Sequence, residues 1–220
     1  MKTPFSVKLF LDCFGLALLI SSLAYYWQTN VFHEVVGFAF MALVLCHNII
    51  NRKWYTSSAK RISSQRWGNI RLLSHAVLIL MVILLLITSI LLSRSINPIG
   101  PFTNDFNFKQ WHQASAYWLL LMIGVHIGRN FPKIKGYLRS KIWKGKFGET
   151  PKFLSLGLWL TIVCIGAYAF AQLDIKNKAL MVQTMNFWDF TNQSMSFFAL
   201  AFVLVLAIMK MTALISHYLK

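Results

Sequence analysis

The chain has 220 residues, of which 57% are hydrophobic, 15% aromatic and only 13% charged. A water-soluble domain of this length needs a larger polar surface, so the composition excludes an ordinary soluble enzyme or binding domain. The formal net charge of +16 would suit a nucleic-acid-binding protein, but the basic residues are concentrated in two short connections between apolar runs. That distribution is typical of the cytoplasmic loops of a membrane protein and argues against a nucleic-acid partner.

Apolar runs of about 20 residues, the length that crosses a bilayer as a helix, follow one another along the whole chain. They cover residues 9–27, 31–50, 72–93, 111–129, 153–172 and 195–218. The first run is too long for a removable signal peptide and lacks a small-residue cleavage site. Because lipid offers no partner to an unpaired backbone group, each run is expected to be helical. The sequence therefore predicts an all-α integral membrane helical bundle with about six transmembrane helices.

The connections between the runs alternate in charge. Residues 51–71 contain Lys and Arg but no acid, and residues 129–152 contain many basic residues and the single acid Glu149. The first connection has no Lys or Arg, and the third and fifth carry few. Since positively charged loops are retained in the cytoplasm, both chain termini are predicted to be cytoplasmic.

Four histidines in the second and fourth runs share one spacing. His33 and His47 are 14 residues apart, as are His112 and His126. Fourteen residues make just under four helical turns, so each pair lies on one helix face with about 21 Å between its members. The second and fourth helices run parallel, which places His33 level with His112 near the outer surface. The same geometry places His47 level with His126 near the inner surface.

Two facing histidine pairs at two depths are what two non-covalent b-type haems with axial imidazoles require. Gly37 and Ala116, one turn from a ligand, would leave room for a porphyrin edge. Non-haem iron or zinc is less well supported, because neither a carboxylate nor a thiolate shares either level in the same register. Two other classes stay open: a haem-containing reductase acting on a small acceptor, and a haem-free transporter or scaffold with a polar cavity.

Other polar residues near the membrane surfaces are candidates for holding the haem propionates, or are ordinary interfacial anchors. The inner candidates are Arg52, Trp54, Arg71 and Arg129, and the outer ones are Trp27, Lys109 and Trp111. His75 is close in depth to His47 and His126, and either takes part in a haem or quinone site or faces the interface. Asp12 either relays protons or pairs with Arg52 or Arg71. Glu34 either orients a neighbouring N–H or faces water.

The segments HEVVGFAFMALVLCHNIINRKW and WHQASAYWLLLMIGVHIGRN resemble the flavinylation-associated cytochromes, which are small bacterial membrane proteins with a four-helix di-haem b-type core. The resemblance covers roughly residues 5–135 and implies that His33, His47, His112 and His126 are the haem ligands. It implies a di-haem core in residues 1–135, followed in residues 136–220 by a basic cytoplasmic loop and a C-terminal helix pair. It further implies electron transfer in the bacterial cytoplasmic membrane, between the quinone pool and flavinylated or haem-bearing partners outside the cytoplasm. Whether the chain is itself an oxidoreductase stays open.

Overall fold

The structure, a computed structural model, describes residues 3–59, 66–96, 100, 102, 104–141, 152–184 and 187–218, with residues 54, 56–59, 66–69, 71 and 152–154 described by their backbone alone. Throughout this part the regular structure is helical, which confirms the all-α prediction. The helices are α1 (Phe5–Leu23), η1 (Tyr25–Trp27), α2 (Asn30–Ala59), α3 (Arg66–Leu92), α4 (Phe106–Lys141), α5 (Lys152–Gln172), α6 (Ile175–Ala179) and α7 (Phe190–Tyr218).

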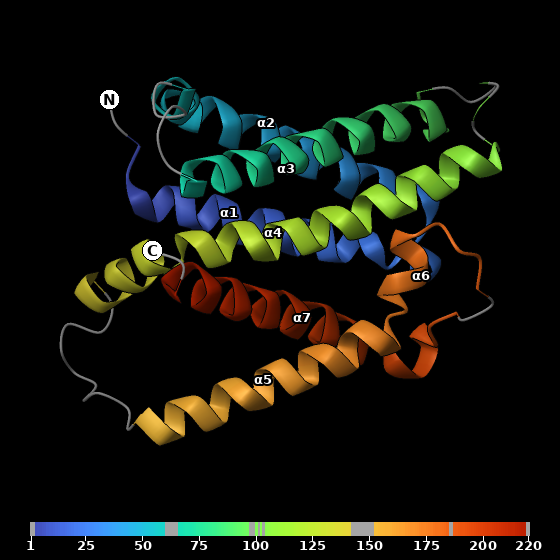
Figure 1. Ribbon diagram of the computed structural model, residues 1–220. Helices are drawn as coiled ribbons and strands as arrows, with labels where there is room; N and C mark the ends of the chain where they lie inside the picture. Colours follow the sequence, from blue (N-terminus) through green and yellow to red (C-terminus); the bar gives the residue numbers. More distant parts are fainter. Residues whose placement is uncertain are drawn as a thin grey trace.

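The long helices cross the molecule back and forth between two ends (Figure 1). The start of α1, the end of α2, the start of α3, the end of α4, the start of α5 and the end of α7 all lie at one end, on the left of the figure. The η1 and α6 segments lie at the opposite end. The first and last long helices, and the helix ends that flank the two basic connections, therefore meet on the same side of the bundle.

Five helices of the described chain are long and apolar enough to cross a membrane: α1, the Asn30–Lys53 part of α2, the Leu72–Leu92 part of α3, the Ser155–Gln172 part of α5, and α7. The predicted span at residues 111–129 lies in α4, which is long enough but is not among these five. Within residues 111–129, His112, Gln113, His126 and Arg129 lower the mean hydropathy. Other helices cover much of α4, so its side chains need not be as apolar as those of a helix that faces lipid.

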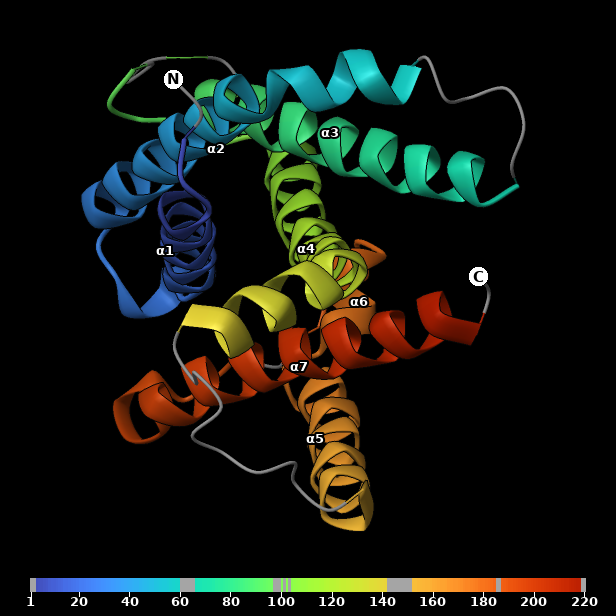
Figure 2. The ribbon, with the colours of Figure 1, turned by 90° about the vertical axis from the view of Figure 1, so that its left-hand side faces the viewer.

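The α4 helix occupies the centre of the bundle (Figure 2). It packs against α3 on one side and against α7 on the other, while α5 packs on the far side of α7 and α1 packs beside α2. Leu119 and Leu120 on α4 are 1% and 0% exposed. Close contact with α7 depends on two α4 glycines: a Cβ on Gly124 would lie 2.9 Å from Ile208, and one on Gly128 would overlap the carbonyl oxygen of Met209. Small residues of this kind let two membrane helices approach closely.

Short segments close the end of the bundle that carries α6. The Trp118 indole N–H donates to the Ala179 carbonyl (3.1 Å), which fixes α6 against α4. Lys178 donates to the Leu173 carbonyl (2.8 Å) and lies over the Tyr117 ring. Burial at this site lowers the pKa of the Lys178 ammonium below its ordinary value. The C-terminal part of the chain is therefore joined to α4 through α6 as well as through α7.

Candidate functional site

The predicted outer histidine pair is present in the structure. The ring centroids of His33 on α2 and His112 on α4 are 6.0 Å apart, with an angle of 72° between the ring planes. The Nδ1 atom of His33 is buried and has no hydrogen-bond partner among the described residues. The Tyr25 ring lies edge-on to the other side of His33, at 5.0 Å. Two imidazoles from parallel helices thus face each other at one depth.

The predicted inner pair is also present, and a third imidazole lies beside it. The rings of His47 and His126 are 6.4 Å apart at an angle of 74°. His75 on α3 lies on the same level, 5.1 Å from the His126 ring. The sequence prediction that His75 is close in depth to these two histidines is therefore confirmed.

The ring separations suit a six-coordinate metal with axial imidazoles. A metal–imidazole bond is about 2 Å long, so two rings that bind one ion from opposite sides have centroids about 6 Å apart. The outer pair at 6.0 Å and the His47–His126 pair at 6.4 Å fit this distance. Among the described residues, no three His, Cys, Asp or Glu side chains form a cluster suited to a metal ion. At each level, two imidazoles at this separation would suit the axial positions of a haem, which would supply the other ligands itself.

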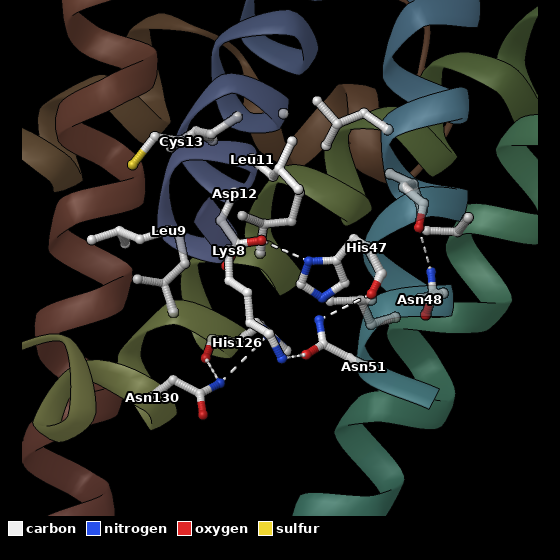
Figure 3. A pocket seen from close by; sticks show the side chains of 18 of the residues that line it. Lys8, Leu9, Leu11, Asp12, Cys13, His47, Asn48, Asn51, His126 and Asn130 are labelled. Atoms are coloured by element: carbon white, nitrogen blue, oxygen red, sulfur yellow. Dashed lines mark hydrogen bonds and ion pairs between the residues drawn. The ribbon is translucent and has the colours of Figure 1, made fainter. Parts of the chain in front are cut away.

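A cavity of about 470 Å³ opens at the inner level (Figure 3). It lies among the first four long helices, and its walls include Asp12 on α1, His47 on α2, His75 on α3 and His126 on α4. Apolar side chains of α2 and α4 also line it, namely Phe40, Val44, Leu119 and Ile123. This space between the two histidine-bearing helices fits a flat apolar macrocycle with a polar edge. At Gly37, about one turn before Phe40 on α2, a Cβ would meet nothing within 4 Å, but Gly37 is not among the described residues that line this cavity.

The polar rim of the cavity differs from the one that the sequence predicts. It contains Lys8, Asn51, Asn130 and Lys133, and the Lys8 ammonium donates to Asn51 (2.8 Å). Lys8 lies on α1, far in sequence from the four paired histidines. Lys133, seven residues after His126 on α4, belongs to the stretch that the sequence assigns to a basic cytoplasmic connection. The cavity rim therefore carries cations suited to carboxylates such as propionates.

Two of the residues that the sequence singles out for propionates, Arg52 and Arg129, are not among the described residues that line the cavity. Arg52 is exposed, and Arg129 binds Ser74 and the Ile70 carbonyl, which ties α4 to α3. Trp111 is 46% exposed and Ala116 is buried in α4. The side chains of Trp54 and Arg71 lie outside the described residues.

Asp12 makes a direct contact with the inner histidine pair. Its Oδ1 lies 2.6 Å from Nδ1 of His47, as Figure 3 shows. The residues are 35 positions apart, and the sequence left Asp12 between proton relay and an arginine partner. The structure instead pairs it with a histidine of the site.

Glu34, next to His33, joins the outer ends of α2 and α3. Its carboxylate accepts hydrogen bonds from the Ser93 hydroxyl (2.9 Å) and from the backbone N–H groups of Arg94 (2.9 Å) and Ser95 (3.2 Å). It also accepts one from Asn30 within α2 (2.7 Å). Glu34 thus satisfies donors just past the end of α3, and it holds the first turns of α2, where His33 lies.

Replacing Glu34 with Gln should destabilise this outer junction. An amide keeps one acceptor oxygen but turns its NH₂ group toward backbone donors, so we expect a cost of about 1–3 kcal/mol. The measurement is the thermal unfolding of the detergent-purified protein, followed by circular dichroism. Asn30→Ala, which removes only the contact within α2, is the control and should cost less. Equal unfolding temperatures for Glu34→Gln and wild type would contradict the role assigned to this carboxylate.

Comparison with known proteins places the chain in a family. The profile of the family described as prokaryotic cytochrome b561 matches residues 6–130, which is more than half of the chain and contains all four paired histidines. No curated protein and no solved structure matches the chain. The matched segment runs through the helices that line the inner cavity and carry both histidine pairs. The chain therefore belongs to the prokaryotic cytochrome b561 family, a family of membrane helical bundles that bind haem b and transfer electrons.

Proposed function

We propose that this cytochrome carries electrons across the membrane through two b-type haems, one held by His33 and His112 and the other by His47 and His126. The observation that carries the proposal is the pair of imidazole contacts at two depths, 6.0 and 6.4 Å between ring centroids. Family membership independently supports haem b as the cofactor. When bound, haem b supplies a reversible one-electron change at its iron.

The protein residues would hold and shield the two groups. The four imidazoles provide axial nitrogens, and buried side chains such as Phe40 (3% exposed) and Leu119 (1% exposed) exclude water between the levels. Lys8 and Lys133, which line the cavity, would bind the carboxylates of the inner group. Since the two levels are about 21 Å apart along the helix axis, an electron that passes between them crosses most of the hydrocarbon core.

The division of the chain follows from the same geometry. We propose that residues 1–135 form the di-haem core and that residues 136–220 add a basic cytoplasmic connection and a peripheral helix pair. The cavity is lined by the first four long helices alone among the described residues, with lining positions from Phe5 to Ile134. The positive-inside pattern supports a cytoplasmic location for both termini and for the inner haem.

The resemblance to flavinylation-associated cytochromes supports a more specific role. In this proposal the protein exchanges electrons with the quinone pool and with flavinylated or haem-bearing proteins outside the cytoplasm. The outer histidine pair lies at the end of the bundle that would face such partners. Exposed aromatic rings at this end, Tyr26 and Trp27 among them, are suited to a membrane interface.

The test is a reduced-minus-oxidised visible spectrum of the purified protein, with haem quantified as its pyridine adduct. We expect b-type α and Soret bands and about two haems per chain. Reconstituted into liposomes, the protein should pass electrons from an impermeant donor outside to ferricyanide trapped inside. A colourless protein from haem-supplied cells would overturn the proposal in favour of a haem-free transporter. Haem-dependent turnover of a small acceptor on one side only would favour the reductase.

A further inference from the structure

Each histidine pair contains one ring whose Nδ1 meets a hydrogen-bond acceptor, and the two acceptors differ in charge. At the inner level, His47 Nδ1 lies 2.6 Å from the carboxylate of Asp12. At the outer level, His112 Nδ1 lies 3.2 Å from the hydroxyl of Thr88. Thr88 itself is 2% exposed, so this contact is shielded from water.

The hydrogen-bond partners fix the tautomers of both rings. A carboxylate only accepts, so the proton of the His47 contact lies on Nδ1. The Thr88 hydroxyl has one hydrogen and lies near the carbonyls of Leu84 (2.9 Å) and Leu85 (3.1 Å), which can only accept. With this hydrogen donated to a carbonyl, the hydroxyl oxygen is an acceptor toward His112. In both rings Nδ1 therefore carries the hydrogen, and the Nε2 lone pair is left free to bind a metal.

We propose that Asp12 and Thr88 are positioning residues that set the two haems at different reduction potentials, with the inner haem lower than the outer one. The inference rests on the proposed di-haem function. A charged acceptor makes a shorter and stronger hydrogen bond than a neutral one, and it raises the basicity of the ring that it holds. A more basic axial ligand stabilises the oxidised metal, which lowers the potential of the inner haem.

The surroundings of the two levels act in the same direction. The side chains of His47 and Asp12 are 30% and 42% exposed, and both line the open cavity at the inner level. Thr88 and Ser115, one turn from His112, are almost fully buried. Low dielectric disfavours the extra positive charge of oxidised iron and raises the potential of the outer haem. Lys8 and Lys133 on the inner rim act in the opposite sense, but the direct contact on His47 Nδ1 is made by the carboxylate.

This difference gives electron flow a preferred direction. At equilibrium an electron on the protein resides mainly on the haem of higher potential, which is the outer one. Transfer from the cytoplasmic side to the outer side is then downhill within the protein.

The experiment is a redox titration of the haem-loaded protein in detergent, followed at the α band. Wild type should titrate in two components, and His112→Ala should retain only the lower one. Asp12→Asn keeps the shape of the side chain and removes its charge. The midpoint potential of the lower component should therefore rise by at least about 59 mV, which is a tenfold change in the one-electron equilibrium constant. Asp12→Glu keeps the charge and should stay near wild type. Asp189→Asn, which removes an exposed acid away from both pairs, is the control.

The outcomes separate this inference from the function on which it rests. The inference would be overturned if Asp12→Asn bound two haems with unchanged midpoint potentials. It would also be overturned if Asp12→Glu shifted the lower potential as much as Asp12→Asn does. Both results would leave the di-haem proposal intact. A rise confined to the higher component would overturn it as well. An Asp12→Asn protein that loses only the lower component supports the role of Asp12 at the inner ring, and the Asp12→Glu titration then decides the role of charge. A wild-type protein without haem would instead refute the proposed function.

Discussion

Replacing His47 or His112 with Ala should lower the haem content of the purified protein from about two to about one per chain. Each substitution removes one of two facing imidazoles whose ring centroids are 6.4 or 6.0 Å apart. The remaining ring cannot hold a six-coordinate iron by itself. Electron transfer across liposome membranes should fall to the background rate in both variants, because the remaining haem serves only one side. Pyridine adduct quantification and ferricyanide reduction inside the liposomes measure the two effects.

His75 provides the matched control for this prediction. It is a third imidazole on the inner level, 5.1 Å from His126, and it lines the same cavity as His47. His75→Ala should keep two haems and most of the transfer rate. If His75→Ala lost one haem while His47→Ala kept both, the inner ligands would be His75 and His126, and the assignment of His47 would be wrong.

Replacing Gly128 with Val should strongly destabilise the contact between α4 and α7. A Cβ at this position would overlap the backbone carbonyl of Met209 and lie 2.7 Å from the Thr212 Cβ. A backbone atom cannot turn away as a side chain can, so the helices must separate. Overpacking of this kind costs about 1–3 kcal/mol or more. We expect a lower thermal unfolding temperature and a smaller monodisperse fraction in size-exclusion chromatography.

Gly136→Val tests the same substitution on the same helix without the clash. A Cβ on Gly136 would meet nothing within 4 Å, so this variant should unfold close to the wild-type temperature. Equal losses in the two variants would show that the effect comes from valine in α4 itself and not from its contact with α7.

Much of this architecture could be predicted because it follows from periodicity. Apolar runs of membrane length predict the long helices, and the repeated spacing of His33–His47 and His112–His126 predicts two facing pairs. Parallel helices leave little freedom in how equal spacings align, so the outer and inner contacts appear as expected. The number of apolar spans differs, because hydropathy measures suitability for lipid and α4 is surrounded mainly by protein.

The residues around the histidines were harder to predict because their contacts depend on helix rotation. The Asp12 carboxylate reaches His47 because the face of α1 that carries Asp12 is turned toward α2. In the same way, Thr88 reaches His112 because α3 packs on α4. A shift of one position turns a helix face by about 100°. Depth alone therefore suggests Arg52 for the inner rim, whereas the described residues that line the cavity include Lys8 and Lys133 and not Arg52.

The central place of α4 has a consequence for how the protein is made. Ribosomes release the chain from its N-terminus, so α1 to α4, with both histidine pairs, enter the membrane before α7 exists. In that interval the α4 face that α7 later covers is exposed to lipid. Gly124 and Gly128 on this face have no polar side chain that lipid would penalise. The four helices that include both histidine pairs can therefore pack together before the C-terminal helices are made.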